Sequence, residues 1–213
     1  MPSRIRNATP TDVPFLSWVV LAASRSHLTR GAFDLLVGGS EPERRHFISA
    51  LLLARPSWCH HASFRIAEVR GEAAAALAAY PVSGEGLSPP EEILPEVARA
   101  EGWSEARLSA AFAAMGPFLG CVPEEDREAW AVEWVATDPD FRRRGLVVQL
   151  LDEVLEDGHR HGHRVAQLLI LLGNTPAQRA YEKVGFRIVD ERRTPEFEAA
   201  LGCPGLARME ASL

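Results

Sequence analysis

The feature that constrains the fold most is the middle of the chain, where strand and helix patterns alternate at short intervals. Residues 130–137, "WAVEWVAT", and residues 164–173, "RVAQLLILLG", have the apolar composition of strands, the second as a continuous run. Between them, residues 146–157 repeat apolar side chains at spacings of three and four, as an amphipathic helix does. A strand, a helix and a second strand in this order indicate an α/β fold, in which helices cover a sheet.

The helix between these two strands is the clearest in the sequence. Its inward face is expected to hold Val147, Leu150, Leu151, Val154 and Leu155. Its outward face is polar and holds Gln149, Asp152, Glu153 and Glu156. Gly158 is predicted to end the helix, because glycine is favoured just beyond a helix C-terminus.

The two ends of the chain add further strands to the predicted sheet. These strands are expected at residues 3–6, 63–69, 73–81, 186–193 and 206–213. Two helices separate the first of these strands from the second. One begins near Thr11 or Asp12, and the other begins at Ser40, which stands in a capping-box relation to Glu43.

Residues 83–127 differ in character from the rest, and we expect them to form a helical insertion between the third and fourth strands. The segment opens with glycines and prolines, which favour a loop. Two helical patterns follow, at residues 91–100 and 105–116, and Ser104 can cap the second. Residues 1–213 are therefore expected to form a single α/β domain that carries this insertion.

Composition limits the classes of function. No apolar run is long enough to span a membrane, and the opening "MPSRIRNATP" lacks the apolar segment of a signal peptide. The three cysteines are too few and too scattered for a disulfide framework or a zinc site. We therefore expect a cytoplasmic protein without a membrane partner. The net charge of −6 argues against a nucleic-acid partner, since such proteins usually carry excess cations.

A basic loop, "FRRRG", precedes the central helix. The N–H groups at the start of a helix, together with the helix dipole, form a site for an anion. Arg142, Arg143 and Arg144 add positive charge, and Gly145 lets the backbone approach a ligand closely. The loop therefore suits a diphosphate, although three arginines before a helix are also compatible with a solvated loop.

A later short helix is marked by "NTPAQRAYEKVGF". Thr175 is predicted to cap it, Pro176 to occupy its first position, and Gly185 to supply the left-handed residue at its end. Its apolar face is expected to consist of Ala177, Ala180, Tyr181 and Val184. Two alanines and a tyrosine on this face indicate close approach to a ligand, with one hydroxyl directed at it.

These two segments resemble the GNAT superfamily of N-acetyltransferases. The family's pyrophosphate loop is matched by "TDPDFRRRGLV", and its later Asn, Tyr and Gly-Phe by Asn174, Tyr181, Gly185 and Phe186. The resemblance implies a mixed, partly split central sheet flanked by helices. It also implies transfer of an acetyl group from acetyl-CoA, as co-substrate, to a primary amine by direct attack. Because dimers are common in the family, a homodimer is possible.

The resemblance assigns roles to individual residues. Tyr181 would protonate the departing CoA thiolate, and Asn174 would hydrogen-bond the pantetheine arm. The backbone groups of Val135 and Thr137 would pair with the pantetheine amides, as an added strand would. The alternatives for the two side chains are a core tyrosine and a plain turn residue.

The same resemblance places the diphosphate on the backbone from Arg142 to Val147, including the N–H groups of Arg144, Gly145 and Leu146. Val147 departs from the family, which has Gly or Ala at this position. A β-branched side chain there is expected to crowd the diphosphate or to shift the helix. We therefore expect weaker or adjusted CoA binding.

Glu133 is a carboxylate within an otherwise apolar strand, and burial would raise its pKa and make it a better base. Strand alternation places it on the face opposite Trp130, Val132 and Trp134, from which it would face the substrate. The alternative is a salt bridge to an arginine on a neighbouring strand. Glu128 is a weaker candidate for the base.

The acceptor amine is not defined by these motifs. By resemblance it would contact residues 23–40 and the insertion, and small amines, aminoglycoside-like molecules, amino acids and protein N-termini all remain open. A non-catalytic module that binds CoA or a protein partner is the alternative function. No metal site is expected, because the histidines of "GHRHGHR" have no clear fourth ligand and suit a helix C-terminus.

Overall fold

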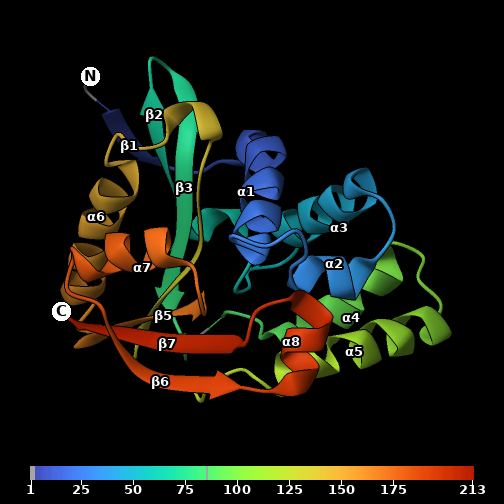
Figure 1. Cartoon of the computed structure of the whole chain (residues 1–213). Helices are drawn as coiled ribbons and strands as arrows, with labels where there is room; N and C mark the ends of the chain where they lie inside the picture. The colour runs from blue at the N-terminus through green and yellow to red at the C-terminus, as the bar shows by residue number, and fades with distance from the viewer. Residues whose placement is uncertain (1–2, 85) are drawn as a thin grey trace.

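The computed structural model describes residues 3–84 and 86–213 and contains a seven-stranded mixed sheet with helices on both faces (Figure 1). The strand order is β1-β2-β3-β4-β5-β7-β6. The strands are β1 Ser3–Asn7, β2 Phe64–Val69, β3 Glu72–Pro81, β4 Trp130–Thr137, β5 Val165–Leu171, β6 Arg187–Arg193 and β7 Gly205–Ser212. Among these described strands only β4 and β5 pair in parallel. The predicted α/β fold is confirmed.

The helices divide between the two faces of the sheet. They are α1 Val13–Arg25, α2 Ala32–Val37, α3 Glu41–Leu53, α4 Pro90–Ala100, α5 Glu105–Leu119, α6 Leu146–Arg160, α7 Thr175–Glu182 and α8 Pro195–Leu201. The first five build one hydrophobic core against β2 and β3, and α6 and α7 build a second core on the opposite face. A third, smaller core joins α8 to β5 and β7. Helices thus cover both faces of the sheet, as expected for an α/β fold.

Two short helices, α2 and α8, were not expected from the sequence. Each is held by a local side-chain bond at its start. Asp34 accepts from the Gly31 N–H at 2.9 Å before α2, and Thr194 accepts from the Phe197 N–H at 3.1 Å at α8. Helices this short have too few turns for an apolar periodicity to appear, so their caps are the main local signal.

The predicted helical insertion is present as α4 and α5, between β3 and β4. Both helices contribute apolar residues to the first core, among them Ile93, Val97 and Met115. Arg55, which follows α3, donates to Glu96 on α4 at 2.8 Å. The insertion therefore packs on α2 and α3 and extends the helical layer on that face (Figure 1).

The sheet is split between β4 and β5. These strands pair only at Trp130↔Ala166 and Ala131↔Gln167, whereas β5 pairs with β7 along its whole length. Beyond this point β4 follows β3 instead. Among residues 3–84 and 86–213, its backbone edge on the β5 side therefore has no strand partner from Val132 onward.

A β-bulge lies at the start of the unpaired part of β4. Ala78 pairs with Glu133 and Ala76 pairs with Ala136, so two residues of β4 stand opposite the single residue Leu77. Trp134 adopts φ 55°, which is uncommon for a residue other than glycine. A bulge bends its strand and increases its twist, which accounts for the departure of β4 from β5.

Gly158 does not end the central helix, as the sequence had suggested. The helix α6 continues to Arg160, and Gly158 lies buried within it. A Cβ atom at Gly158 would lie 2.8 Å from the Trp130 ring and 2.9 Å from Leu213. The glycine is therefore required for close packing of α6 on β4 and not for a left-handed helix end.

We therefore expect Gly158→Ala to lower the free energy of unfolding by about 1–2 kcal/mol, since overpacking outweighs the gain in helix propensity. Urea denaturation followed by circular dichroism measures this change. Asp152→Ala, at an exposed position of the same helix, is the control and should change the free energy by less than about 0.5 kcal/mol. An unchanged or increased stability of Gly158→Ala would contradict this account of the packing.

Candidate active site

A groove with a volume of about 1570 Å³ runs through the split in the sheet. It is lined by β4, β5, the start of α6, α7, the end of α1, α2 and the insertion. Eleven residues that the sequence singled out for the site line it: Glu133, Val135, Thr137, Arg142, Arg143, Arg144, Gly145, Leu146, Val147, Asn174 and Tyr181. Glu128, the weaker candidate for the base, is exposed and is not among the described residues that line the groove. The structure thus brings the candidates from β4, the basic loop and α7 together.

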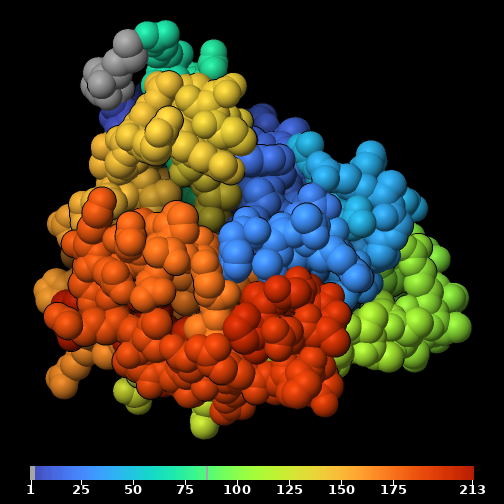
Figure 2. Space-filling model, viewed as in Figure 1, coloured from blue at the N-terminus to red at the C-terminus, as the bar shows by residue number. Residues whose placement is uncertain are grey.

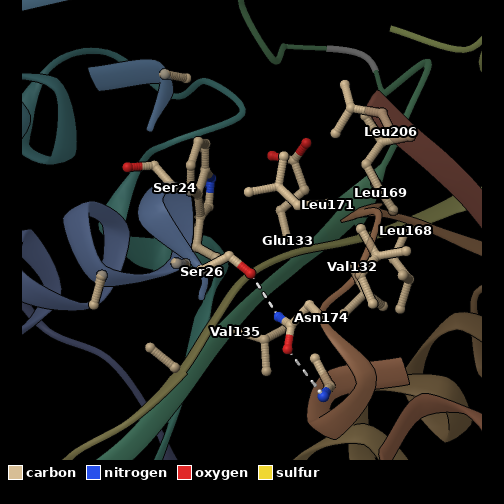
Figure 3. Close-up of a pocket in the computed structure, with 18 of the residues that line it drawn as sticks. Ser24, Ser26, Val132, Glu133, Val135, Leu168, Leu169, Leu171, Asn174 and Leu206 are labelled. Carbon is tan, nitrogen blue, oxygen red and sulfur yellow. Dashed lines mark hydrogen bonds between the residues drawn. The ribbon is translucent and has the colours of Figure 1, made fainter. Parts of the chain in front are cut away.

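The N-terminal and C-terminal parts of the chain meet on the face shown in Figure 2, where the first helices (blue) adjoin α7 and α8 (orange and red). One link between them is the bond from Asn174 Nδ2 to Ser26 Oγ, at 2.5 Å (Figure 3). This hydrogen bond joins the end of α1 to the start of α7 beside the groove.

The unpaired edge of β4 forms one wall of the groove. From Val132 to Thr137 the strand has β3 on one side and, in the part of the chain that the structure describes, no strand on the other. Alternate backbone N–H and C=O groups of an edge strand point away from its neighbour and are free to pair with an extended ligand. Val135 and Thr137, whose backbone groups were expected to bind, lie in this segment.

The basic loop ends at Gly145, which has φ 75° and directly precedes α6. The N–H groups of the first turn of a helix have no partner within that helix, so an anion can bind them. Arg142, Arg143 and Arg144 are exposed. Arg144 donates to the Asp140 carbonyl at 3.0 Å and lies over the Phe141 ring. The loop is thus shaped by local contacts.

Val147, the departure from the family pattern, is half-buried. Its side chain packs against the core between α6 and the sheet, and it also lines the groove. The core accommodates the branched side chain without interrupting the first turn of α6. The free N–H groups of that turn remain available for an anion.

Tyr181 is buried on α7 and packs edge-to-face on Phe186, with ring centroids 6.2 Å apart. Burial raises the pKa of its hydroxyl above the ordinary value, so the hydroxyl stays protonated at neutral pH. Within the described part of the chain no hydrogen bond to this hydroxyl is found, and the residue lines the groove. A protonated donor is therefore available at this wall.

Asn174, not Thr175, caps α7. Its Oδ1 atom accepts from the Ala177 N–H at 3.3 Å, and α7 begins at Thr175. Both polar groups of the Asn174 side chain therefore have protein partners, one in α7 and one in Ser26. Gly185 has φ 98°, which confirms the left-handed conformation expected after this helix.

Glu133 projects from β4 into the groove (Figure 3). Burial raises the pKa of its carboxyl group to about 7; the Tyr80 hydroxyl opposes this shift and Glu125 adds to it. Its Oε2 atom is buried and has no hydrogen-bond partner, and no arginine pairs with it, among residues 3–84 and 86–213. The alternative of a salt bridge on a neighbouring strand is therefore wrong.

The alternation expected along β4 fails at Trp134. Trp130 and Val132 face the second core, opposite Glu133, as expected. The bulge turns Trp134 to the first core instead, the face on which Ala78, the cross-strand partner of Glu133, also packs. Glu133 and the ring of Trp134 are therefore on the same side of the strand.

Several residues that line the groove were missed by the sequence analysis. Phe33, Trp58 and Tyr80 carried no motif. Met115 and Phe118, on the helix α5 of the insertion, line the groove as well. Only the fold brings these residues together, since they come from four separate elements or loops.

The histidines do not form a metal site. The rings of His161 and His163 pack against Trp130, and their Nδ1 atoms contact the Asp157 and Glu128 carbonyls at 2.7 and 2.8 Å. Within the described residues no group of three or more His, Cys, Asp or Glu side chains is placed to hold a metal ion.

None of the helices described is both long and apolar enough to cross a bilayer.

Comparison with known proteins defines the family. The model of the acetyltransferase (GNAT) family matches residues 40–186, more than half of the chain. The protein therefore belongs to the GNAT family of acetyltransferases. It is also similar to an uncharacterized N-acetyltransferase of Methanocaldococcus jannaschii, with 32% identity over 62 residues, which are 29% of this chain and 27% of that relative's length.

Solved structures share the fold. A crystal structure of an acetyltransferase has a TM-score of 0.68 and 21% identity, over 98% of each chain. The N-acetylglutamate synthase of Neisseria gonorrhoeae, solved with coenzyme A and N-acetylglutamate, has a TM-score of 0.51 and 12% identity. That similarity covers all of this chain and 35% of the synthase.

Proposed function

We propose that this protein transfers an acetyl group from acetyl-CoA to a primary amine, by direct attack of the amine on the thioester. The observation that carries the proposal is the carboxyl group of Glu133 beside the open edge of β4, whose buried Oε2 atom has no hydrogen-bond partner among the described residues. GNAT family members use acetyl-CoA or CoA, and the groove fits such a molecule. It offers free strand groups for amides, helix N–H groups for a diphosphate, and small residues at Ala177 and Ala180.

Glu133 would act as the base. An alkylammonium ion has a pKa near about 10 and must lose a proton before it can attack. A carboxyl group whose pKa is raised to about 7 is ionised at slightly alkaline pH, and it accepts a proton more readily than an ordinary glutamate. The arriving ammonium would also pair with the otherwise unpartnered Oε2 atom.

The remaining steps are the attack of the amine on the acetyl carbon and the departure of the CoA thiolate. The neutral amine nitrogen forms a bond to the acetyl carbon, and the free N–H groups of β4 stabilise the developing oxyanion. As the carbon–sulfur bond breaks, the nitrogen releases its second proton to solvent and Tyr181 donates its proton to the thiolate, giving the amide and free CoA. The proton taken up by Glu133 restores Tyr181 through solvent.

A non-catalytic module is the weaker alternative. Binding alone needs no ionisable group in the split of the sheet, and a buried carboxylate without a partner costs free energy. The costly placement of Glu133 is explained by proton transfer during a reaction.

The acid role is tested by Tyr181→Phe. We expect kcat to fall about 100-fold, since a general acid contributes on this order, while acetyl-CoA binding is retained. Steady-state release of free CoA and isothermal titration measure the two quantities. Tyr80→Phe, the variant of the chain's other tyrosine, should lower kcat far less. An unchanged kcat in Tyr181→Phe would contradict the role.

The base role is tested by the pH dependence of kcat/KM. The carboxyl pKa is raised to about 7 and the ionised form is active, so kcat/KM should fall as the pH drops below about 7. Glu133→Gln should lower kcat/KM about 100-fold or more and remove this limb.

Tyr80→Phe provides the matched control for the pH profile. Because the Tyr80 hydroxyl lowers the pKa of Glu133, its removal should move the limb to higher pH while activity remains. A limb that persists unchanged in Glu133→Gln would show that another group is the base.

A further inference from the structure

The part of the groove next to Glu133 has an aromatic wall, which consists of Phe33, Trp58 and Trp134. We refer to this part as the second compartment of the groove. The bulge in β4 places Trp134 on the same side of the strand as Glu133. An amine that binds at Glu133 therefore meets an aromatic surface immediately beyond its nitrogen.

The three rings form a packed surface. The ring centroid of Trp134 lies 5.2 Å from that of Trp58 and 5.7 Å from that of Phe33, with interplanar angles of 38° and 51°. The rings of Phe33 and Trp58 are stacked with an interplanar angle of 21°. Rings packed against one another in this way do not surround a cation as a cage does. They offer faces and edges for another apolar or aromatic group.

The groove has a further apolar lining, and the insertion supplies much of it. The lining side chains there are Leu36, Leu87, Leu94, Met115, Phe118 and Leu119. Met115 and Leu94 pack into the first core, so this wall is anchored. The charged side chains that the insertion adds to the lining, Glu91, Glu124, Glu125 and Arg127, are exposed to solvent, whereas Leu36 and Met115 are buried. The less exposed part of this lining is therefore apolar.

Charge at the groove favours a cationic head group. Glu133 carries the unpartnered carboxyl oxygen, and Glu91, Glu124 and Glu125 also line the groove on this side. Arg127 is the single basic residue among the lining residues of the insertion segment that the structure describes. A ligand with one ammonium group and an apolar remainder matches this distribution.

We propose that the acceptor is a primary amine joined by a short linker to an aromatic or bulky apolar group. This inference rests on the proposed function and names its substrate class. Polyamines and aminoglycosides fit poorly, because their additional ammonium or hydroxyl groups would lose water against aromatic and aliphatic walls. The further carboxylates of the lining, Glu91, Glu124 and Glu125, are exposed, and pairing with an exposed carboxylate contributes little free energy. The product is the corresponding N-acetyl amide.

Isothermal titration of wild-type protein saturated with CoA tests the inference without requiring turnover. 2-Phenylethylamine, spermidine and kanamycin are titrated at pH 8, where Glu133 is ionised and the amine is protonated. We expect phenylethylamine to bind at least ten times more tightly than either polar amine. Equal or weaker binding of phenylethylamine would overturn the inference.

A pair of tryptophan variants locates the binding surface. Trp58→Ala should weaken phenylethylamine binding about tenfold, as expected for loss of a buried apolar contact, and should leave CoA binding unchanged. Trp103→Ala is the control, because Trp103 packs on Phe47 within the helical layer and does not line the groove. Equal effects of the two variants would contradict the assigned surface.

Different results would contradict the proposed function and the proposed substrate class. If the folded protein does not bind CoA at all, the proposed function is wrong. If CoA binds and polar amines are acetylated faster than phenylethylamine, acetyl transfer stands and the substrate class is wrong. Thermal unfolding of each variant confirms that it is folded before binding is measured.

Discussion

The site depends on the separation of β4 from β5 after only two paired residues. A strand edge opened inside a sheet exposes backbone groups that would otherwise pair, and here these groups line a groove. The bulge at Trp134 bends β4 away and holds a non-glycine residue at positive φ, a strained conformation of the kind found at functional sites. The same bulge brings the carboxylate and the aromatic wall to one face.

Much of the fold could be predicted from the sequence, because long elements carry strong periodicity. The hairpin of β2 and β3, the helix after Ser40 and the two helices of the insertion were all expected and are present. The short helices α2 and α8 were missed, since six or seven residues hold too little pattern. Gly158 was misinterpreted, because its role depends on Trp130, which approaches it only in the folded protein.

The residues of the candidate site likewise include some that the sequence predicted and some that only the fold shows. Residues on the basic loop and α7 could be found because their local motifs have a physical meaning, and the fold places them along one groove. The cap of α7 was assigned one residue too late, to Thr175 instead of Asn174. The side of β4 that Trp134 occupies could not be predicted, because a bulge breaks the alternation of side chains. Phe33, Trp58 and Tyr80 carry no motif and become neighbours of the site only through tertiary packing.

Hydrogen–deuterium exchange with and without acetyl-CoA tests the central claim most directly. The open edge of β4 and the first turn of α6 have backbone N–H groups that a bound ligand would protect. Peptides that cover residues 133–137 and 145–148 should exchange more slowly when acetyl-CoA is added, and the edge strand β6 should not change. Binding of acetyl-CoA without protection of these two segments would contradict the account of the site.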